Sequence, residues 1–182
     1  IFADTQSEPD HVYEWLDWLE TQLPFPIHRV TAGNLRQDMI NSAKTHSRCA
    51  SPPLFVLEGQ GQGMLMRYCT TDYKIAPIYK KMRELIGLKR APKEVVIEQW
   101  IGISQDEIQR MKMSRDKWVE NRWPLLEKRM SRLACLQWMK ENGYNELPRK
   151  SACTFCPYHD NATWREMKAN DTKSWEDAVA VD

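Results

Sequence analysis

Ile1-Phe2-Ala3-Asp4-Thr5-Gln6-Ser7-Glu8-Pro9 opens the sequence with an apolar stretch that runs directly into turn-forming and helix-starting residues. A second strand and helix are indicated at 25–30 and 34–44. The helix of the first pair is indicated by apolar residues that recur at helical spacing until a proline stops the run: Val12, Trp15, Leu16, Leu19, Leu23 and then Pro24. This alternation is typical of a parallel sheet covered by helices, so the sequence predicts an α/β fold.

A further strand signal lies at 95–101, a stretch rich in β-branched residues. Ser104 and Glu107 follow it directly and fit a capping box, which predicts the start of a helix. The rest of the sequence is mostly helical in pattern, with Ser131 as the expected cap of one helix.

The composition is that of one ordinary domain: 182 residues, 42% hydrophobic and 28% charged, with 26 Lys and Arg against 25 Asp and Glu. The near balance of charge argues against a general polyanion binder, which needs a strongly basic face. No apolar run approaches the ~20 residues of a membrane-spanning helix and no leader opens the sequence, so we expect a cytoplasmic protein. Ile1 already reads as part of a strand, and we expect further residues before it. The expected domain covers 1–182, with an α/β part at 1–104 and a helical part at 105–182 that carries the Cys loop.

Five cysteines are an odd number in a chain too large to need disulfide staples, which favours free thiols or metal ligands. The sharpest motif is Cys153-Thr154-Phe155-Cys156-Pro157, a CxxC in a tight loop. Its cysteines fit three interpretations: a redox dithiol, two inert buried thiols, or a pair of metal ligands. Because the pair follows a polar loop rather than a strand, we favour metal ligation.

Two ligand sets are open. Cys69 and Cys135 would complete four thiolates with the CxxC pair, which suits tetrahedral zinc or a four-iron cluster. His159 together with Cys135 and the pair would make a Cys3His zinc site instead. Cys49 is the expected spare thiol.

Polar residues also gather at the expected strand ends, where open α/β sheets bind their ligands. Asp4 and Thr5 end the first strand, while Gly102 and Ser104 end the later one. A helix starting after Gly102 would seat a phosphate through free backbone N–H groups, although a plain turn that needs a cap explains the same residues.

Two cations stand near the start of another expected helix. Lys74 would meet an unfavourable helix dipole there, and an anion between Lys74 and Arg67 would remove that conflict. The alternative is a pair of solvated surface charges. A longer basic stretch from Arg110 to Lys150 includes Trp118 and Trp123 and fits nucleic-acid binding, but interspersed acidic residues favour a salt-bridged surface.

Taken in order, four segments resemble the phosphoadenosine phosphosulfate reductase family, particularly its phage and mobile-element members, within the PP-loop adenine nucleotide alpha hydrolase superfamily. The segments span nearly the whole chain. They are Ile1–Thr5 with Glu8, Arg67–Lys74 with Pro77, Trp100–Ser104 with Asp106, Glu107 and Arg110, and Ser151–Pro157.

The resemblance implies a five-stranded, mostly parallel sheet with helices on both faces, which binds ATP or a related adenine nucleotide across the strand ends. Asp4 and Thr5 would border the nucleotide, and Lys74 and Arg67 would face phosphate oxygens. The resemblance also implies a 4Fe–4S cluster, with Cys69, Cys153 and Cys156 matching family ligands and Cys135 as the fourth. Ser104 stands where the family commonly has Arg, a role that Arg110 would take over.

Two departures shape the expected activity. The family's Ser-Gly-Gly-x-Asp-Ser phosphate loop would precede Ile1, and no cysteine follows Cys156 to act as the catalytic thiol of a reductase. We therefore expect ATP pyrophosphatase or sulfur-transfer chemistry, with a nucleic acid or a sulfur carrier as partner. The alternative is a non-catalytic nucleotide- or nucleic-acid-binding module with a structural zinc.

Overall fold

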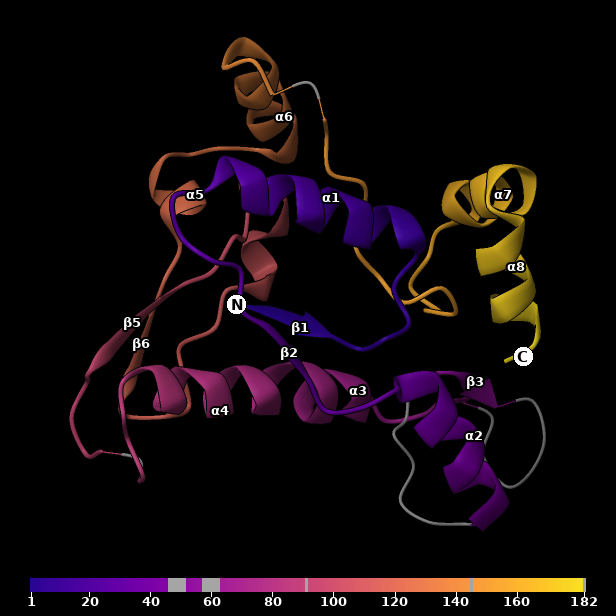
Figure 1. Ribbon diagram of the computed structural model, residues 1–182, viewed down its shortest axis with the longest axis horizontal. Helices are drawn as coiled ribbons and strands as arrows, with labels where there is room; N and C mark the ends of the chain where they lie inside the picture. Colours follow the sequence, from indigo (N-terminus) through magenta and orange to yellow (C-terminus); the bar gives the residue numbers. More distant parts are fainter. Residues whose placement is uncertain (46–51, 57–62, 91, 145, 182) are drawn as a thin grey trace. The chain divides into compact units, whose positions relative to one another are not determined.

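The computed structural model describes residues 1–45, 52–56, 63–90, 92–144 and 146–181. Helices and short strands alternate along these ranges (Figure 1). The chain forms two units, Ile1–Leu85 with Pro148–Asp182, and Ile86–Leu147. These limits differ from the division at residue 104 that the sequence suggested, because the last 35 residues join the first unit.

The first unit begins with a parallel β–α–β arrangement. Strand β1 (Phe2–Asp4) pairs in parallel with β2 (Arg29–Thr31), so that Asp4 lies opposite Thr31. Helix α1 (Asp10–Gln22) connects the two strands and buries Val12 and Leu16, as its apolar period predicts. The predicted strand, turn and helix are thus confirmed.

The rest of the first unit is mostly helical. Helix α2 (Leu35–Thr45) precedes an antiparallel pair, β3 (Phe55–Val56) and β4 (Gly63–Met64). Three helical pieces then follow one another without a break: α3 (Tyr68–Thr70), the π-helical turn η1 (Thr71–Ile75) and α4 (Ala76–Leu85). Helices α7 (Asn161–Asn170) and α8 (Thr172–Val179) complete the unit, and side chains of Asp160 and Asp171 cap their first turns.

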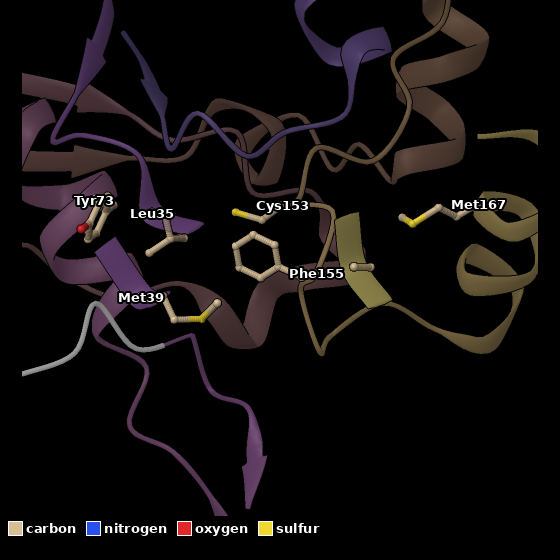
Figure 2. Close-up of a cluster of buried hydrophobic side chains, with 7 residues drawn as sticks. Leu35, Met39, Tyr73, Cys153, Phe155 and Met167 are labelled. Carbon is tan, nitrogen blue, oxygen red and sulfur yellow. The ribbon is translucent and has the colours of Figure 1, made fainter. Parts of the chain in front are cut away.

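The core of this unit includes the cysteine loop. One cluster of buried side chains joins α2, η1, the loop and the last two helices: Leu35, Met39, Tyr73, Cys153, Phe155, Met167 and Ala178 (Figure 2). Full burial of a large apolar side chain contributes roughly 1.5–3 kcal/mol. The loop is therefore held by packing and is part of the hydrophobic core.

The second unit has its own parallel pair, β5 (Ile97–Trp100) with β6 (Val119–Arg122). It also contains the 3-10 helix η2 (Gln105–Arg110) and the helices α5 (Pro124–Glu127) and α6 (Arg132–Glu141). The Ser131 side chain caps α6 by accepting from Ala134 N at 3.1 Å, which confirms that prediction.

Two details of the second unit differ from expectation. The capping box at Ser104 is wrong: its hydroxyl donates to Asp106 Oδ2 at 3.3 Å, and the helix that follows is a short 3-10 helix. Strand β6 lies inside the part expected to be helical, because Val119 is the sole apolar residue of Val119–Arg122 and gives no alternation.

The strands among the described residues form three two-stranded sheets, two of them parallel. The molecule is thus a mixed helix and strand protein of α/β character. Within the part of the chain that the structure describes, no helix is both long and apolar enough to cross a membrane.

Candidate functional site

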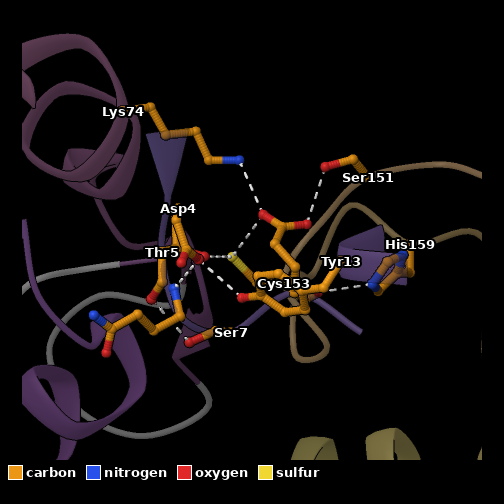
Figure 3. Close-up of polar contacts among 10 residues, drawn as sticks. Asp4, Thr5, Ser7, Tyr13, Lys74, Ser151, Cys153 and His159 are labelled. Carbon is orange, nitrogen blue, oxygen red and sulfur yellow. Dashed lines mark hydrogen bonds and ion pairs between the residues drawn. The ribbon is translucent and has the colours of Figure 1, made fainter. Parts of the chain in front are cut away.

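One group of polar contacts in the first unit centres on Glu8, in the turn between β1 and α1. Figure 3 labels its partners Lys74, Ser151 and Cys153. The Glu8 side chain has 0% exposure, and Oε1 lies 3.5 Å from Lys74 Nζ and 4.0 Å from Cys153 Sγ. Ser151 Oγ donates to the other carboxylate oxygen at 3.1 Å. A buried carboxylate is costly unless it is paired and hydrogen-bonded, so these partners are what make its burial tolerable.

Thr5 ties the end of β1 to the cysteine loop. Its side chain is fully buried, and Oγ1 lies 3.2 Å from Cys153 Sγ. Thr154 N donates to Ser7 O at 2.8 Å, which adds a backbone link between the same two segments. Leu35 N donates to Thr5 O at 3.1 Å and anchors the start of α2. The strand end is thus fixed from two sides.

Asp4 is held by its own turn. Its Oδ1 accepts from Gln6 N at 2.7 Å and from Tyr13 Oη at 2.8 Å. Burial and the neighbouring Asp4 carboxylate raise the pKa of Tyr13 above its ordinary value, so the phenol remains a donor. Gln6 has a φ of 55°, a left-handed conformation that is uncommon for a residue with a side chain.

The cysteine loop is a hydrogen-bonded turn. Cys156 N donates to Cys153 O at 3.0 Å, and the same carbonyl accepts from His159 Nε2 at 2.9 Å. Burial, and secondly the Glu8 carboxylate, raises the pKa of Cys153 to about 11. A redox dithiol needs a readily formed thiolate, so this environment argues against the redox interpretation of the motif.

Three of the proposed metal ligands belong to one core. Cys69 and Cys156 pack against the buried cluster that contains Cys153, whereas Cys135 lies on α6 in the second unit. Cys49 lies outside the described residues. Within those residues, no group of three His, Cys, Asp or Glu side chains is arranged to hold a metal ion. Cys69, Cys153 and Cys156 thus share one core, but the described residues do not form a complete set of metal ligands.

His159 offers one observation that fits the zinc alternative. A carbonyl oxygen only accepts hydrogen bonds, so Nε2 carries the proton and Nδ1 carries the lone pair. Nδ1 is buried and has no hydrogen-bond partner among the described residues. Burial lowers the pKa of His159, which keeps the ring neutral and its lone pair available. A neutral imidazole nitrogen without a partner is the form in which histidine binds zinc, and this is the single observation among the described residues that fits the Cys3His alternative.

The structure separates the two predicted cations. Lys74 lies in η1 and reaches Glu8, but Arg67 places its guanidinium 5.0 Å from the centre of the Tyr158 ring, two residues past Cys156. Both cations therefore lie near parts of the cysteine segment. No contact between them is found in the described ranges.

The predicted site residues of the second unit are engaged with close neighbours in sequence. Ser104 is buried against Asp106, and Arg110 pairs with Glu107 on the surface. Gly102 is exposed and lies in open space. The helix that was expected to seat a phosphate after Gly102 is the six-residue η2, so that prediction loses its support.

The basic stretch behaves as a salt-bridged surface. Trp118 has 2% exposure and packs inside the unit, so its ring is not available to stack on a base. Arg122 pairs with Glu98 at 3.3 Å and with Glu127 at 2.8 Å. These contacts favour the ion-pair interpretation over nucleic-acid binding.

A cavity of about 500 Å³ lies beside the turn that follows β1. Its wall includes residues from the turn, α2, the cysteine loop and α8: Gln6, Ser7, Glu8, Arg36, Thr154, Ser174 and Asp177. Small-molecule sites commonly have volumes of about 300–1,000 Å³, so the space is large enough for a ligand at this strand end.

The central position of Glu8 was not predicted; the sequence singled it out only within one segment of the resemblance. An acidic residue just before a helix is ordinarily predicted to be exposed and to interact with the helix dipole. Ser151 likewise appeared only as the first residue of a segment of the resemblance, and Tyr13 was missed because nothing local distinguishes it. No protein-family model, curated protein or solved structure matches this chain.

Proposed function

We propose that the chain is part of an adenine-nucleotide-binding enzyme of the PP-loop type, related to phosphoadenosine phosphosulfate reductases. One observation supports this most strongly. Three of the four segments that carry the resemblance meet at the Glu8 carboxylate, through Glu8 itself, Lys74 and the loop with Ser151 and Cys153. On this proposal, a mostly parallel sheet with helices on both faces presents its strand ends to ATP.

The proposed reaction is of the ATP pyrophosphatase type. An acceptor oxygen attacks the α-phosphorus, the bond to the β-phosphate oxygen breaks, and pyrophosphate leaves. A sulfur or nitrogen nucleophile then displaces AMP from the adenylated acceptor, and a sulfur-carrier protein is the proposed donor. Lys74 and Arg67 stabilise the charge that develops on the phosphates, while Asp4 and Thr5 border the nucleoside. Loss of one such contact typically costs about 3 kcal/mol of transition-state stabilisation.

The cysteines are the proposed metal ligands. Cys69, Cys135, Cys153 and Cys156 would hold a 4Fe–4S cluster, which supplies sulfur or electron chemistry when bound. The packing of three of these cysteines at one core supports the proposal. A structural zinc with His159 in place of Cys69 is the alternative, supported by the unpartnered Nδ1.

The metal proposal is tested by purifying the protein without oxygen and measuring iron, zinc, sulfide and the visible spectrum. Four irons and four sulfides per chain, with broad absorbance lost in Cys153→Ser, would support the cluster. One zinc and no colour would support the structural site. Metal-free protein at full yield, with Cys153→Ser unchanged in stability, would contradict both.

The nucleotide proposal is tested by ATP titration in a calorimeter. Lys74 is removed together with its partner, as Glu8→Gln with Lys74→Met, so that no buried charge is left alone. We expect ATP affinity to fall at least tenfold relative to Glu8→Gln alone. Lys81→Met is the matched control, because Lys81 pairs with Glu84 on the surface of α4. Equal affinity in all variants would exclude Lys74 from the site.

A further inference from the structure

The ion pair between Glu8 and Lys74 is unequal in its exposure. The Glu8 side chain is fully buried, whereas that of Lys74 retains 35% of its exposure. The Nζ to Oε1 distance of 3.5 Å exceeds the roughly 2.7–2.9 Å of a strong charge-assisted hydrogen bond. Lysine has three N–H donors, so this one long contact leaves donor capacity on the solvent side.

The side chains of Glu8 and Lys74 also differ in conformational freedom. Glu8 is fixed by Ser151 on one oxygen and by burial on all sides. Lys74 has a flexible four-carbon stem and reaches solvent, so its ammonium group is able to turn toward an incoming anion. Such an anion would share the ammonium with Glu8, and the Glu8 carboxylate would repel it. The repulsion grows with the charge of the anion.

We propose that Glu8 is a specificity-determining residue that lowers the affinity of this site for polyphosphates by occupying Lys74. The inference rests on the proposed function, which makes Lys74 the cation that faces the phosphates. Its consequence for the reaction is that pyrophosphate, the most highly charged product, binds weakly enough to leave. Glu8 thus favours product release at the cost of some affinity for ATP.

The test compares wild type with Glu8→Gln in titrations with pyrophosphate, ATP, AMP and adenosine. Glutamine keeps the shape and the hydrogen bond to Ser151 but removes the charge. We expect pyrophosphate and ATP to bind about tenfold more tightly to Glu8→Gln. AMP should gain less and adenosine should gain nothing. A structural role for Glu8 would not produce a gain graded by ligand charge.

Two further variants isolate the contact. In Glu8→Gln with Lys74→Met the gain should disappear, because there is no ammonium left to release. Glu8→Asp keeps the charge but retracts it by one methylene, and an intermediate gain is expected even if the glutamine variant folds poorly. Thermal melting of every variant provides the check on folding.

The outcomes distinguish the inference from the function on which it rests. If wild type binds ATP but Glu8→Gln binds pyrophosphate equally or more weakly, the inference is wrong and the proposed function stands. The same holds if the gain persists without Lys74 or extends equally to adenosine. If neither wild type nor any folded variant binds a nucleotide or pyrophosphate, both are wrong.

Discussion

The two units differ most in what they bury. The second unit keeps most of its charge on the surface, and Ser104 is its one buried polar residue among those described. The first unit buries seven: Thr5, Ser7, Glu8, Ser42, Thr154, His159 and Ser174. Buried polar groups reduce stability unless they are fully paired, whereas exposed ion pairs contribute little either way. The first unit is therefore the part of the described chain whose stability depends most on the pairing of buried polar groups.

The largest expected effect comes from breaking the buried pair on one side only. Lys74→Met should lower the free energy of unfolding by about 3–5 kcal/mol, because Glu8 is left as an uncompensated buried carboxylate. Urea denaturation measures the change. Most of the loss should return when Glu8→Gln is added.

Its counterpart in the second unit is Arg122→Met, which removes an exposed cation from Glu98 and Glu127. No measurable loss is expected there, since water solvates the freed carboxylates. If Lys74→Met and Arg122→Met lowered the free energy of unfolding equally, the difference in burial between the two units would have no effect on stability.

The next effect depends on pH. The pKa of Cys153 is raised to about 11 from an ordinary value of 9.0, chiefly by burial, so the folded state favours the neutral thiol. The unfolded chain loses its proton first as pH rises, and stability should fall between about pH 9 and 11 by at most about 3 kcal/mol. Urea titrations of metal-free protein across this range measure the slope.

Cys153→Ser should flatten that alkaline slope. Cys135→Ser on α6 is the control: it retains Cys153 and should therefore retain the slope. A slope unchanged by Cys153→Ser would mean that other groups cause the alkaline loss.

A smaller effect is expected at the end of β1. Thr5→Val keeps the shape of a fully buried side chain but removes the hydroxyl next to Cys153 Sγ, which should cost about 1 kcal/mol. Ser104→Ala, whose hydroxyl contacts an exposed carboxylate of Asp106, should cost less. Chemical denaturation measures the free energy of unfolding of both variants. A larger loss for Ser104→Ala than for Thr5→Val would contradict the prediction.

The smallest expected effect on stability comes from glycine substitutions at two left-handed residues, one in each unit, and it should be equal in both. Gln6 and Arg129 have left-handed φ values of 55° and 53°. Glycine adopts this conformation without strain but loses more entropy on folding, so each glycine substitution should stabilise by only about 0.5 kcal/mol. Melting temperatures of Gln6→Gly and Arg129→Gly test this. A larger gain at Gln6 would identify strain particular to the site.

Local patterns in the sequence predicted part of the fold. The apolar period of α1 and the turn before it sufficed for β1 and α1, and Ser131 marked the start of α6. Strand β6 was missed because Val119 is its single apolar residue. The capping box predicted at Ser104 was wrong because the Ser104 hydroxyl donates to the Asp106 carboxylate and does not accept from a backbone N–H group.

The candidate site was harder to predict because its contacts are distant in sequence. Ser151 meets Glu8 across 143 residues, and Cys153 meets Thr5 across 148. No periodicity or spacing encodes such a meeting. The individual residue types were informative for Cys153 and Lys74, whose chemistry is distinctive, but not for Glu8, which resembles any acidic residue near a helix start.

The discontinuity of the first unit has a consequence for synthesis on the ribosome. Glu8 is synthesised 143 residues before its partner Ser151. At about 5–20 residues per second, that delay is roughly 7–30 seconds. Until then the nascent β1 and α1 lack the loop that covers Glu8. Completion of the first unit therefore waits until the cysteine loop has been synthesised, and any metal held by Cys153 would bind only after that point.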